Sequence, residues 1–167
     1  YPRTLAVVGA SKTPGKVGYA ILENLLKSGY SGKIIPVNPT TDELMGLRCY
    51  KDPREAGDPI DHAVIVVPNK AVKAAIEPSV AAGARAVTVI TAGFKETGPE
   101  GLALEKEIAD YCRRRKVRLL GPNCLGLINT ENGMNASFAA QMPKPGAIAI
   151  VSQSGALCTA ILDWAEG

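Results

Sequence analysis

Residues 4–18 read TLAVVGASKTPGKVG, a short apolar run that ends in a loop with glycines at positions 9, 15 and 18. The apolar run Thr4–Val8 is typical of a buried β-strand. The segment Lys16–Ser28 that follows the loop has one apolar helical face, formed by Val17, Ile21 and Leu25. Strand, glycine-rich turn and helix in this order begin a βαβ unit, and the helix N-terminus at such a turn attracts anions. The stretch therefore predicts a parallel sheet with a phosphate site.

The rest of the chain continues the alternation of short apolar runs with helical segments. Further strands are predicted at Lys33–Val37, Ala63–Val67, Ala86–Thr91 and Arg118–Leu120. Helices are predicted over Ala71–Ala82, where Pro78 must kink the helix or begin a second short one, and from about Glu100 to Lys116. The pattern predicts an α/β fold with a Rossmann-like, doubly wound and mostly parallel sheet of about five strands.

The composition changes after Gly121, where Gly, Pro and Asn become frequent. We interpret residues 1–129 as the Rossmann-like domain and residues 130–146 as a linker. A fresh strand is predicted at Ala147–Val151 and a helix from near Gly155. Residues 147–167 are therefore expected to begin a second, flavodoxin-like domain that is mostly missing from this chain.

Composition and charge narrow the classes of function. The 167 residues have a net charge of +3, and 5% of them are aromatic. The positive charge and the aromatic content are both too low to predict nucleic-acid binding. The 4 cysteines are widely spaced and there is 1 histidine, so neither a metal site nor a disulfide scaffold is expected. No apolar run approaches the roughly 18 residues of a membrane helix. We expect a cytoplasmic protein without a membrane partner.

The glycine loop differs from two familiar phosphate-binding motifs. Ser11 stands where GxGxxG has its second glycine, and Val17 follows Lys16 where the Walker motif needs Ser or Thr. The predicted second strand ends in Asn38-Pro39-Thr40, whereas an NAD enzyme usually places an acid there for the ribose. These residues favour a nucleotide with a phosphorylated ribose, and an NAD-binding Rossmann domain remains an alternative.

Six motifs taken together resemble a known family. They are Val8–Ser11, Pro36–Pro39, Val67-Pro68, Thr91–Phe94, Gly121–Gly126 and Ser152–Gly155. In this order they are similar to the N-terminal CoA-binding domain of NDP-forming acyl-CoA synthetases. That superfamily includes the ADP-forming acetyl-CoA synthetase and, more distantly, the succinyl-CoA synthetase alpha subunit. The resemblance covers essentially the whole chain.

The resemblance implies a coenzyme A site along the carboxyl edge of the sheet. The glycine loop would hold the phosphates, the end of the second strand would border the adenosine, and later strand ends would line the pantetheine path. The implied contacts are Gly9, Ala10, Ser11, Lys12, Gly15, Lys16, Val17, Gly18, Asn38, Pro39, Val67, Pro68, Thr91, Ala92, Gly93 and Asn123. Relatives often carry Lys where this chain has Thr40, which leaves Lys12 or Lys16 to hold the ribose phosphate.

The resemblance also implies what lies near the thiol. Asn123 and Cys124 would sit at the thiol end, and the turn with Ser152, Ser154 and Gly155 would cradle phosphate for the next domain. The reaction of the family passes through a phosphohistidine that this chain does not contain, so no catalytic residue is expected here. The single histidine, His62, is expected to be solvated or to cap a strand. A structural, buried role is expected for Cys124 itself.

The leading hypothesis is therefore the CoA-binding part of an enzyme that converts acyl-CoA, ADP and phosphate to carboxylate, CoA and ATP. This ligase fragment is expected to be inactive alone, because ADP, ATP and Mg would bind other parts of the parent protein. Its expected partners are the remainder of its own chain or an ATP-grasp beta subunit, with a homodimer through the apolar tail as a further expectation. The alternative is a CoA-binding regulatory module fused to a lysine acetyltransferase.

Overall fold

A parallel five-stranded sheet forms the centre of the computed structural model, which describes residues 1–165. The sheet order is β2-β1-β5-β6-β7 and every neighbouring pair is parallel. Its strands are β1 (Thr4–Val8), β2 (Lys33–Val37), β5 (His62–Ile65), β6 (Ala86–Val89) and β7 (Arg118–Leu120). The prediction of a doubly wound parallel sheet is confirmed. The chain adds strands first on one side of β1 and then on the other, which opens a crevice between β1 and β5.

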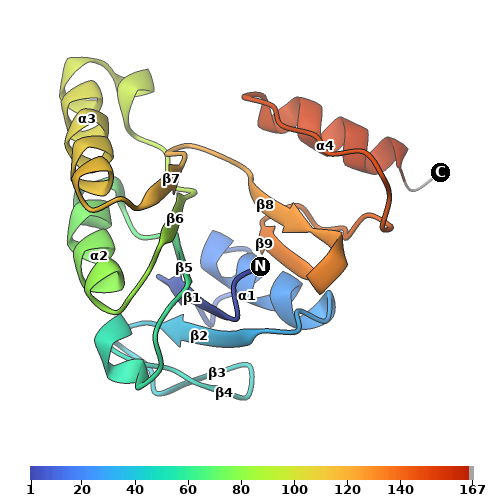
Figure 1. Ribbon diagram of the computed structural model, residues 1–167, viewed down its shortest axis with the longest axis horizontal. Helices are drawn as coiled ribbons and strands as arrows, with labels where there is room; N and C mark the ends of the chain where they lie inside the picture. Colours follow the sequence, from blue (N-terminus) through green and yellow to red (C-terminus); the bar gives the residue numbers. More distant parts are fainter. Residues whose placement is uncertain (166–167) are drawn as a thin grey trace.

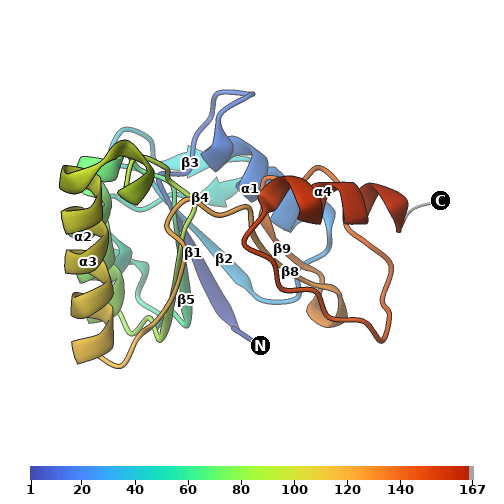
Figure 2. The same ribbon diagram turned by 90° about the horizontal axis from the view of Figure 1, so that it is seen from above.

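Helices cover both faces of this sheet (Figure 1). Figure 2 shows α2 (Asn69–Ala81) and α3 (Pro99–Arg114) on one side, with α1 (Val17–Lys27) on the other. Helix α2 continues through Pro78 as a single helix. The remaining short elements are β3 (Glu43–Leu44), β4 (Leu47–Arg48), η1 (Pro53–Ala56), η2 (Lys95–Thr97), β8 (Gly126–Asn129), η3 (Thr130–Asn132) and β9 (Met134–Ser137). Among the described residues, no helix is long and apolar enough to cross a membrane.

The core has two layers because successive side chains of a strand point to opposite faces. Leu5 and Val7 of β1 pack in the layer that contains α1 and β9, and Ala6 and Val8 pack in the layer that contains α2 and α3. The apolar face predicted for α1 is buried over only part of its length. Ile21 and Leu25 are fully buried, whereas Val17 is 42% exposed at the start of the helix.

The hairpin formed by β8 and β9 corrects the predicted linker. Residues 134–137 are buried and pair with β8, although the sequence analysis placed them between domains. Asn24 of α1 holds this segment, since its Nδ2 donates to the carbonyl oxygens of Ser137 and Ala139 at 2.9 and 2.7 Å. The residues typical of turns in this segment form the turn of a tight hairpin, in which Gly133 has a φ of 68°. The folded unit thus extends past residue 129.

The predicted strand Ala147–Val151 is absent, and the segment is irregular. A strand needs a partner edge for its backbone groups, and here Ile148 and Val151 are 87% and 100% exposed. The following helix α4 (Gly155–Trp164) begins where it was predicted. The Ser154 hydroxyl caps it by accepting the Leu157 N–H at 3.2 Å. Residues 166 and 167 of this predicted segment lie outside the described residues.

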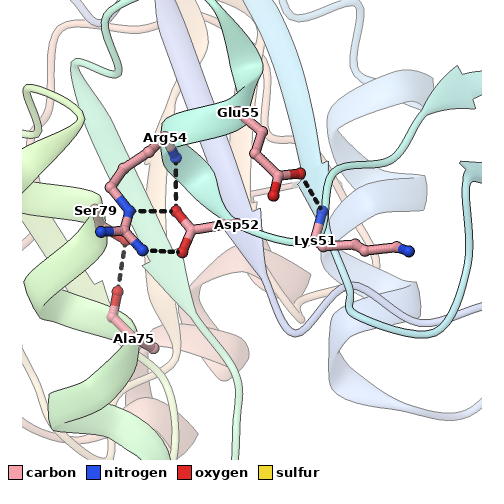
Figure 3. Close-up of polar contacts among 6 residues, drawn as sticks. All are labelled: Lys51, Asp52, Arg54, Glu55, Ala75 and Ser79. Carbon is pink, nitrogen blue, oxygen red and sulfur yellow. Dashed lines mark hydrogen bonds and ion pairs between the residues drawn. The ribbon is translucent and has the colours of Figure 1, made fainter.

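The connection from β2 to β5 is stiffened by η1 (Figure 3). Asp52 accepts the Arg54 N–H at 2.9 Å and pairs with the Arg54 guanidinium through Nε and Nη2 at 2.8 and 2.6 Å. Beside it in the same view, the Ser79 hydroxyl of α2 donates to the Ala75 carbonyl at 2.7 Å. None of these residues lines the cleft described below, so we assign them to the scaffold.

Candidate functional site

A cleft of about 1150 Å³ runs along the carboxyl edge of the sheet. Its floor is made by residues just beyond β5, β6 and β7, and the start of α1 contributes Lys16 and Val17. Ser152, Gln153, Gly155 and Cys158, around the start of α4, line it as well. Open α/β sheets bind ligands at this edge, because parallel strands end there and adjacent loops diverge.

The cleft contains part of the predicted site. The predicted contacts that line it are Lys16, Val17, Val67, Pro68, Thr91, Ala92 and Asn123, together with Ser152 and Gly155 of the predicted phosphate cradle. Other predicted contacts lie outside its lining: Gly9, Ala10, Ser11, Lys12, Gly15, Gly18, Asn38, Pro39, Gly93 and Ser154. Most of this second group belongs to the β1–α1 loop and to the end of β2, and their contacts show how they support the site.

Two glycines of the β1–α1 loop are required by backbone packing. Gly9 has a φ of 93°, and a Cβ there would lie 3.0 Å from both Val66 C and Val67 Cγ1. A Cβ on Gly18 would lie 2.2 Å from the Gly9 carbonyl oxygen, so only glycine lets α1 approach the end of β1. Gly15, by contrast, has a φ of 82° and open space around it. The loop is therefore shaped by Gly9 and Gly18 and is open at Gly15.

The start of α1 is suited to an anion. Lys16 occupies the N-cap position, no side chain caps the helix, and its first turn contains no acidic residue. The first N–H groups of a helix have no intrahelical acceptor and carry the positive end of the helix dipole. Lys16 lines the cleft there, and both Lys16 and Lys12 of the preceding loop are exposed. Backbone and side chains thus present positive charge at this end of the cleft.

Asn38 has a positioning role in this structure. Its Nδ2 donates to the Ala10 carbonyl at 2.7 Å, and its Oδ1 accepts from the N–H and the hydroxyl of Thr40, both at 2.8 Å. The amide therefore ties the end of β2 to the β1–α1 loop. Ala10 itself is fully buried, so its side chain supports the loop from inside.

The loop after β6 is joined to the neighbouring strand ends. The Thr91 hydroxyl donates to the Val67 carbonyl at 2.7 Å, and the Thr91 carbonyl accepts the Asn123 N–H at 3.0 Å. Asn69 and Glu96 also bind this loop through Gly93, and no motif of the sequence identifies these two residues. Hydrogen bonds from side chains to the backbone produce no periodic pattern in a sequence. The neighbouring Thr91–Phe94 motif indicates this loop but not the side chains that hold it.

The Cys124 thiol and the His62 imidazole are both uncharged at neutral pH. Cys124 lines the cleft with its Sγ 3.4 Å from the Val89 carbonyl, and burial raises the pKa of its thiol. His62 is only 4% exposed and lies on the α1 face of β5, so the expectation of a solvated or capping histidine is wrong. Burial lowers the pKa of His62 to about 4. Cys158 of α4 is a second cysteine in the cleft lining.

Known proteins resemble this chain over nearly its whole length. An ADP-forming acetate–CoA ligase of Methanocaldococcus jannaschii is 48% identical over 163 residues, which cover 98% of this chain and 23% of that protein. The alpha subunit of ADP-forming acetate–CoA ligase I of Pyrococcus furiosus is 42% identical and matches 98% of this chain with 36% of the subunit. The chain thus spans about a quarter to a third of the curated relatives it matches.

A solved structure has the same fold. It is a dinucleotide-forming acetyl-coenzyme A synthetase of Candidatus Korarchaeum cryptofilum in complex with phosphate and ADP, with a TM-score of 0.92 and 43% identity. The match covers 98% of this chain and 35% of that one. The family model described as a CoA binding domain matches residues 3–130, which include the glycine loop, the strand ends and Asn123. The chain belongs to the CoA-binding domain family, and its homologues are ADP-forming acyl-CoA synthetases.

Proposed function

We propose that this chain binds coenzyme A in the cleft and forms the CoA-binding part of an ADP-forming acyl-CoA synthetase. One observation carries the proposal: a single cleft joins the basic start of α1, the strand ends at Val67 and Thr91, and the Ser152–Gly155 turn. This arrangement offers a basic end for a diphosphate and, at Val67 and Pro68, apolar surface for a pantetheine arm. The lining also contains the charged side chains of Lys95, Glu96 and Glu105.

The chemistry of each part of the cleft matches one part of CoA. The N–H groups at the start of α1 and the Lys16 ammonium donate charge-assisted hydrogen bonds to the phosphates. Val67 and Pro68 supply apolar surface, and the Thr91-Ala92 backbone supplies polar groups, for the amide-containing arm. Asn123 and Cys124 then lie at the thiol end, where the neutral Cys124 thiol leaves the CoA sulfur as the nucleophile.

The turn before α4 would hold the phosphate that displaces CoA from the acyl group to give an acyl phosphate. The Ser152 hydroxyl accepts the Ser154 N–H at 3.0 Å, and the Ser154 hydroxyl caps α4, so both side chains build the turn. The Leu157 N–H is used by this cap, and the N–H groups of Gly155 and Ala156 remain to bind an anion. A phosphate there would share the cleft with the thiol end, as the interconversion of an acyl phosphate and an acyl-CoA requires.

The remaining parts of the reaction lie outside these residues. We propose that ADP, ATP and Mg bind other parts of the parent protein, either later in the same chain or in an ATP-grasp subunit. Residues 147–165 would begin the next domain, whose surface would cover Ile148 and Val151. In the absence of that domain, two copies of the chain would pair through this tail. A cytoplasmic location agrees with this metabolic role.

Isothermal titration calorimetry with CoA and NAD tests the proposal. CoA is expected to bind and NAD to bind far more weakly, because no acidic side chain follows β2 before Asp42. Lys16→Ala is expected to weaken CoA binding about fivefold through loss of one phosphate contact. The matched control is Lys27→Ala at the other end of α1, where the ammonium pairs with Glu23 at 3.0 Å. Equal binding of NAD and CoA, or equal effects of the two lysine variants, would contradict the proposal.

A further inference from the structure

Both backbone polar groups of Gly93 are held by side chains from other elements. Asn69, the first residue of α2, donates from Nδ2 to the Gly93 carbonyl at 2.8 Å. Glu96 in η2 accepts the Gly93 N–H on Oε1 at 2.6 Å. Gly93 directly follows Thr91 and Ala92, which both line the cleft, and Glu96 lines it as well.

The conformation held by these two side chains is one that favours glycine. Gly93 has a φ of 98°, and a Cβ on it would lie 2.7 Å from Asn69 Nδ2. The Asn69 amide therefore packs directly against the Gly93 backbone. On the other side of Ala92, Thr91 is bound to Val67 and to Asn123. Ala92 is thus the exposed residue between two fixed neighbours.

The hydrogen-bonding roles of the two side chains are fixed by their chemistry. The Gly93 N–H, and secondarily the N–H groups of Glu96 and Phe94, hold the pKa of the Glu96 carboxyl below its ordinary value. Glu96 is therefore an ionised acceptor at neutral pH. Asn69 Oδ1 accepts the Lys70 N–H at 2.8 Å, which leaves its Nδ2 as the donor toward Gly93.

We propose that Asn69 and Glu96 are positioning residues for the pantetheine arm of CoA. By fixing Gly93 they hold the Ala92 backbone at the cleft in an orientation that pairs with an amide group of the arm. The inference rests on the proposed function, because it assumes that CoA occupies the cleft. The two side chains hold the loop beside the arm, whereas the diphosphate is bound by the charges at α1, so they act on one half of the ligand only. Glu96 also lines the cleft. Glu96→Gln separates its role through Gly93 from a direct charge contact, because it keeps the acceptor and removes the charge.

Calorimetry with two probes separates these halves. The probes are CoA and 3′-phospho-ADP, which keeps the adenosine and diphosphate but has no pantetheine. The disruptive variants are Asn69→Ala and Glu96→Ala, with Asn69→Asp as an isosteric variant that has no donor. Glu96→Gln is the conservative variant, since its amide oxygen still accepts the Gly93 N–H. Lys70→Ala and Glu100→Ala are matched controls on exposed neighbouring residues. Thermal unfolding checks that each variant is folded.

Asn69→Ala, Asn69→Asp and Glu96→Ala are expected to weaken CoA binding about tenfold and to leave 3′-phospho-ADP binding within about twofold of wild type. Glu96→Gln and both controls are expected to bind CoA like wild type. Equal losses for the two probes, no loss for either, or failure of Glu96→Gln to restore binding would overturn the inference. A wild-type chain that binds neither probe would instead overturn the proposed function.

Discussion

His62 on β5 and Thr88 on β6 face each other in the core, with His62 Nε2 and Thr88 Oγ1 2.8 Å apart. The two residues are 4% and 1% exposed. They lie near each other because the register pairs His62 with Ala86 and Val64 with Thr88 on neighbouring parallel strands. Burial favours the uncharged imidazole and lowers its pKa to about 4. The hydrogen bond gives the buried His62 imidazole a polar partner, which offsets the cost of removing it from water.

This pair predicts acid sensitivity. The unfolded chain takes up a proton on His62 near pH 6.5, whereas the folded chain does so only near pH 4, so stability is lost as the pH falls between these values. His62 is expected to remove about 3 kcal/mol of unfolding free energy between pH 7 and pH 4. His62→Gln keeps a hydrogen-bonding side chain without this titration. Urea unfolding at both pH values should show a smaller loss in His62→Gln, and identical losses would contradict the prediction.

The glycines of the β1–α1 loop predict a graded effect on stability. Gly18→Ala places a Cβ 2.2 Å from the Gly9 carbonyl oxygen and is expected to cost about 2 to 3 kcal/mol, because α1 must move away from β1. Gly15→Ala meets nothing and is expected to cost about 1 kcal/mol, from its φ of 82° alone. Chemical denaturation compares the two. A Gly15→Ala variant less stable than Gly18→Ala would show that packing does not require Gly18.

Thr40 predicts a gain of affinity on substitution. It is exposed two residues after Asn38, at the end of β2 where we place the adenosine and its ribose phosphate. Thr40→Lys adds a charge there, and the backbone N–H of residue 40 still donates to Asn38. CoA is expected to bind about fivefold more tightly, while dephospho-CoA, which has no ribose phosphate, is expected to bind as before. Tighter binding of both ligands in calorimetry would argue against this placement.

Trp164 reports the state of the tail, since it is the only tryptophan of the sequence. Its side chain is 90% exposed at the end of α4. The emission of the chain at high dilution is therefore expected at the wavelength of a solvated indole and to be readily quenched by iodide. A blue shift that appears as the concentration rises would report pairing of two tails. A blue-shifted emission at nanomolar concentration would show that the tail packs on its own domain.

The sequence predicted the central sheet well because its signals are local. The strands around Val64 and Val87 are near-continuous apolar runs, and the periodicity of α1 marks its buried face. The hairpin β8–β9 was missed since its core contacts, such as Met134 against α1, are distant in sequence. The strand at Ala147–Val151 was predicted from the same kind of apolar run, but pairing depends on an edge that a run of residues does not specify.

The site was predicted through motifs, and the structure divides those motifs by physical role. Thr91 and Asn123 reach the cleft, whereas Gly18 and Asn38 hold backbone segments together. The positioning side chains of Asn69 and Glu96 could not be identified, because single polar residues near strand ends have no pattern of their own. His62 was assigned to the surface because a lone histidine at a strand start is usually solvated; the Thr88 hydroxyl that satisfies it comes from another strand.

The bond from Asn24 to Ser137 joins residues 113 positions apart and has a consequence for synthesis. Helix α1 emerges from the ribosome long before β9, so its contact with the hairpin has to wait for the later residues. At about 5 to 20 residues per second, the delay is roughly 6 to 23 s. During this interval the nascent chain exposes apolar surface on α1 to solvent and to chaperones. A messenger truncated after the codon for Thr130 would encode every strand of the central sheet, but helix α1 of the resulting chain would never be packed against β9.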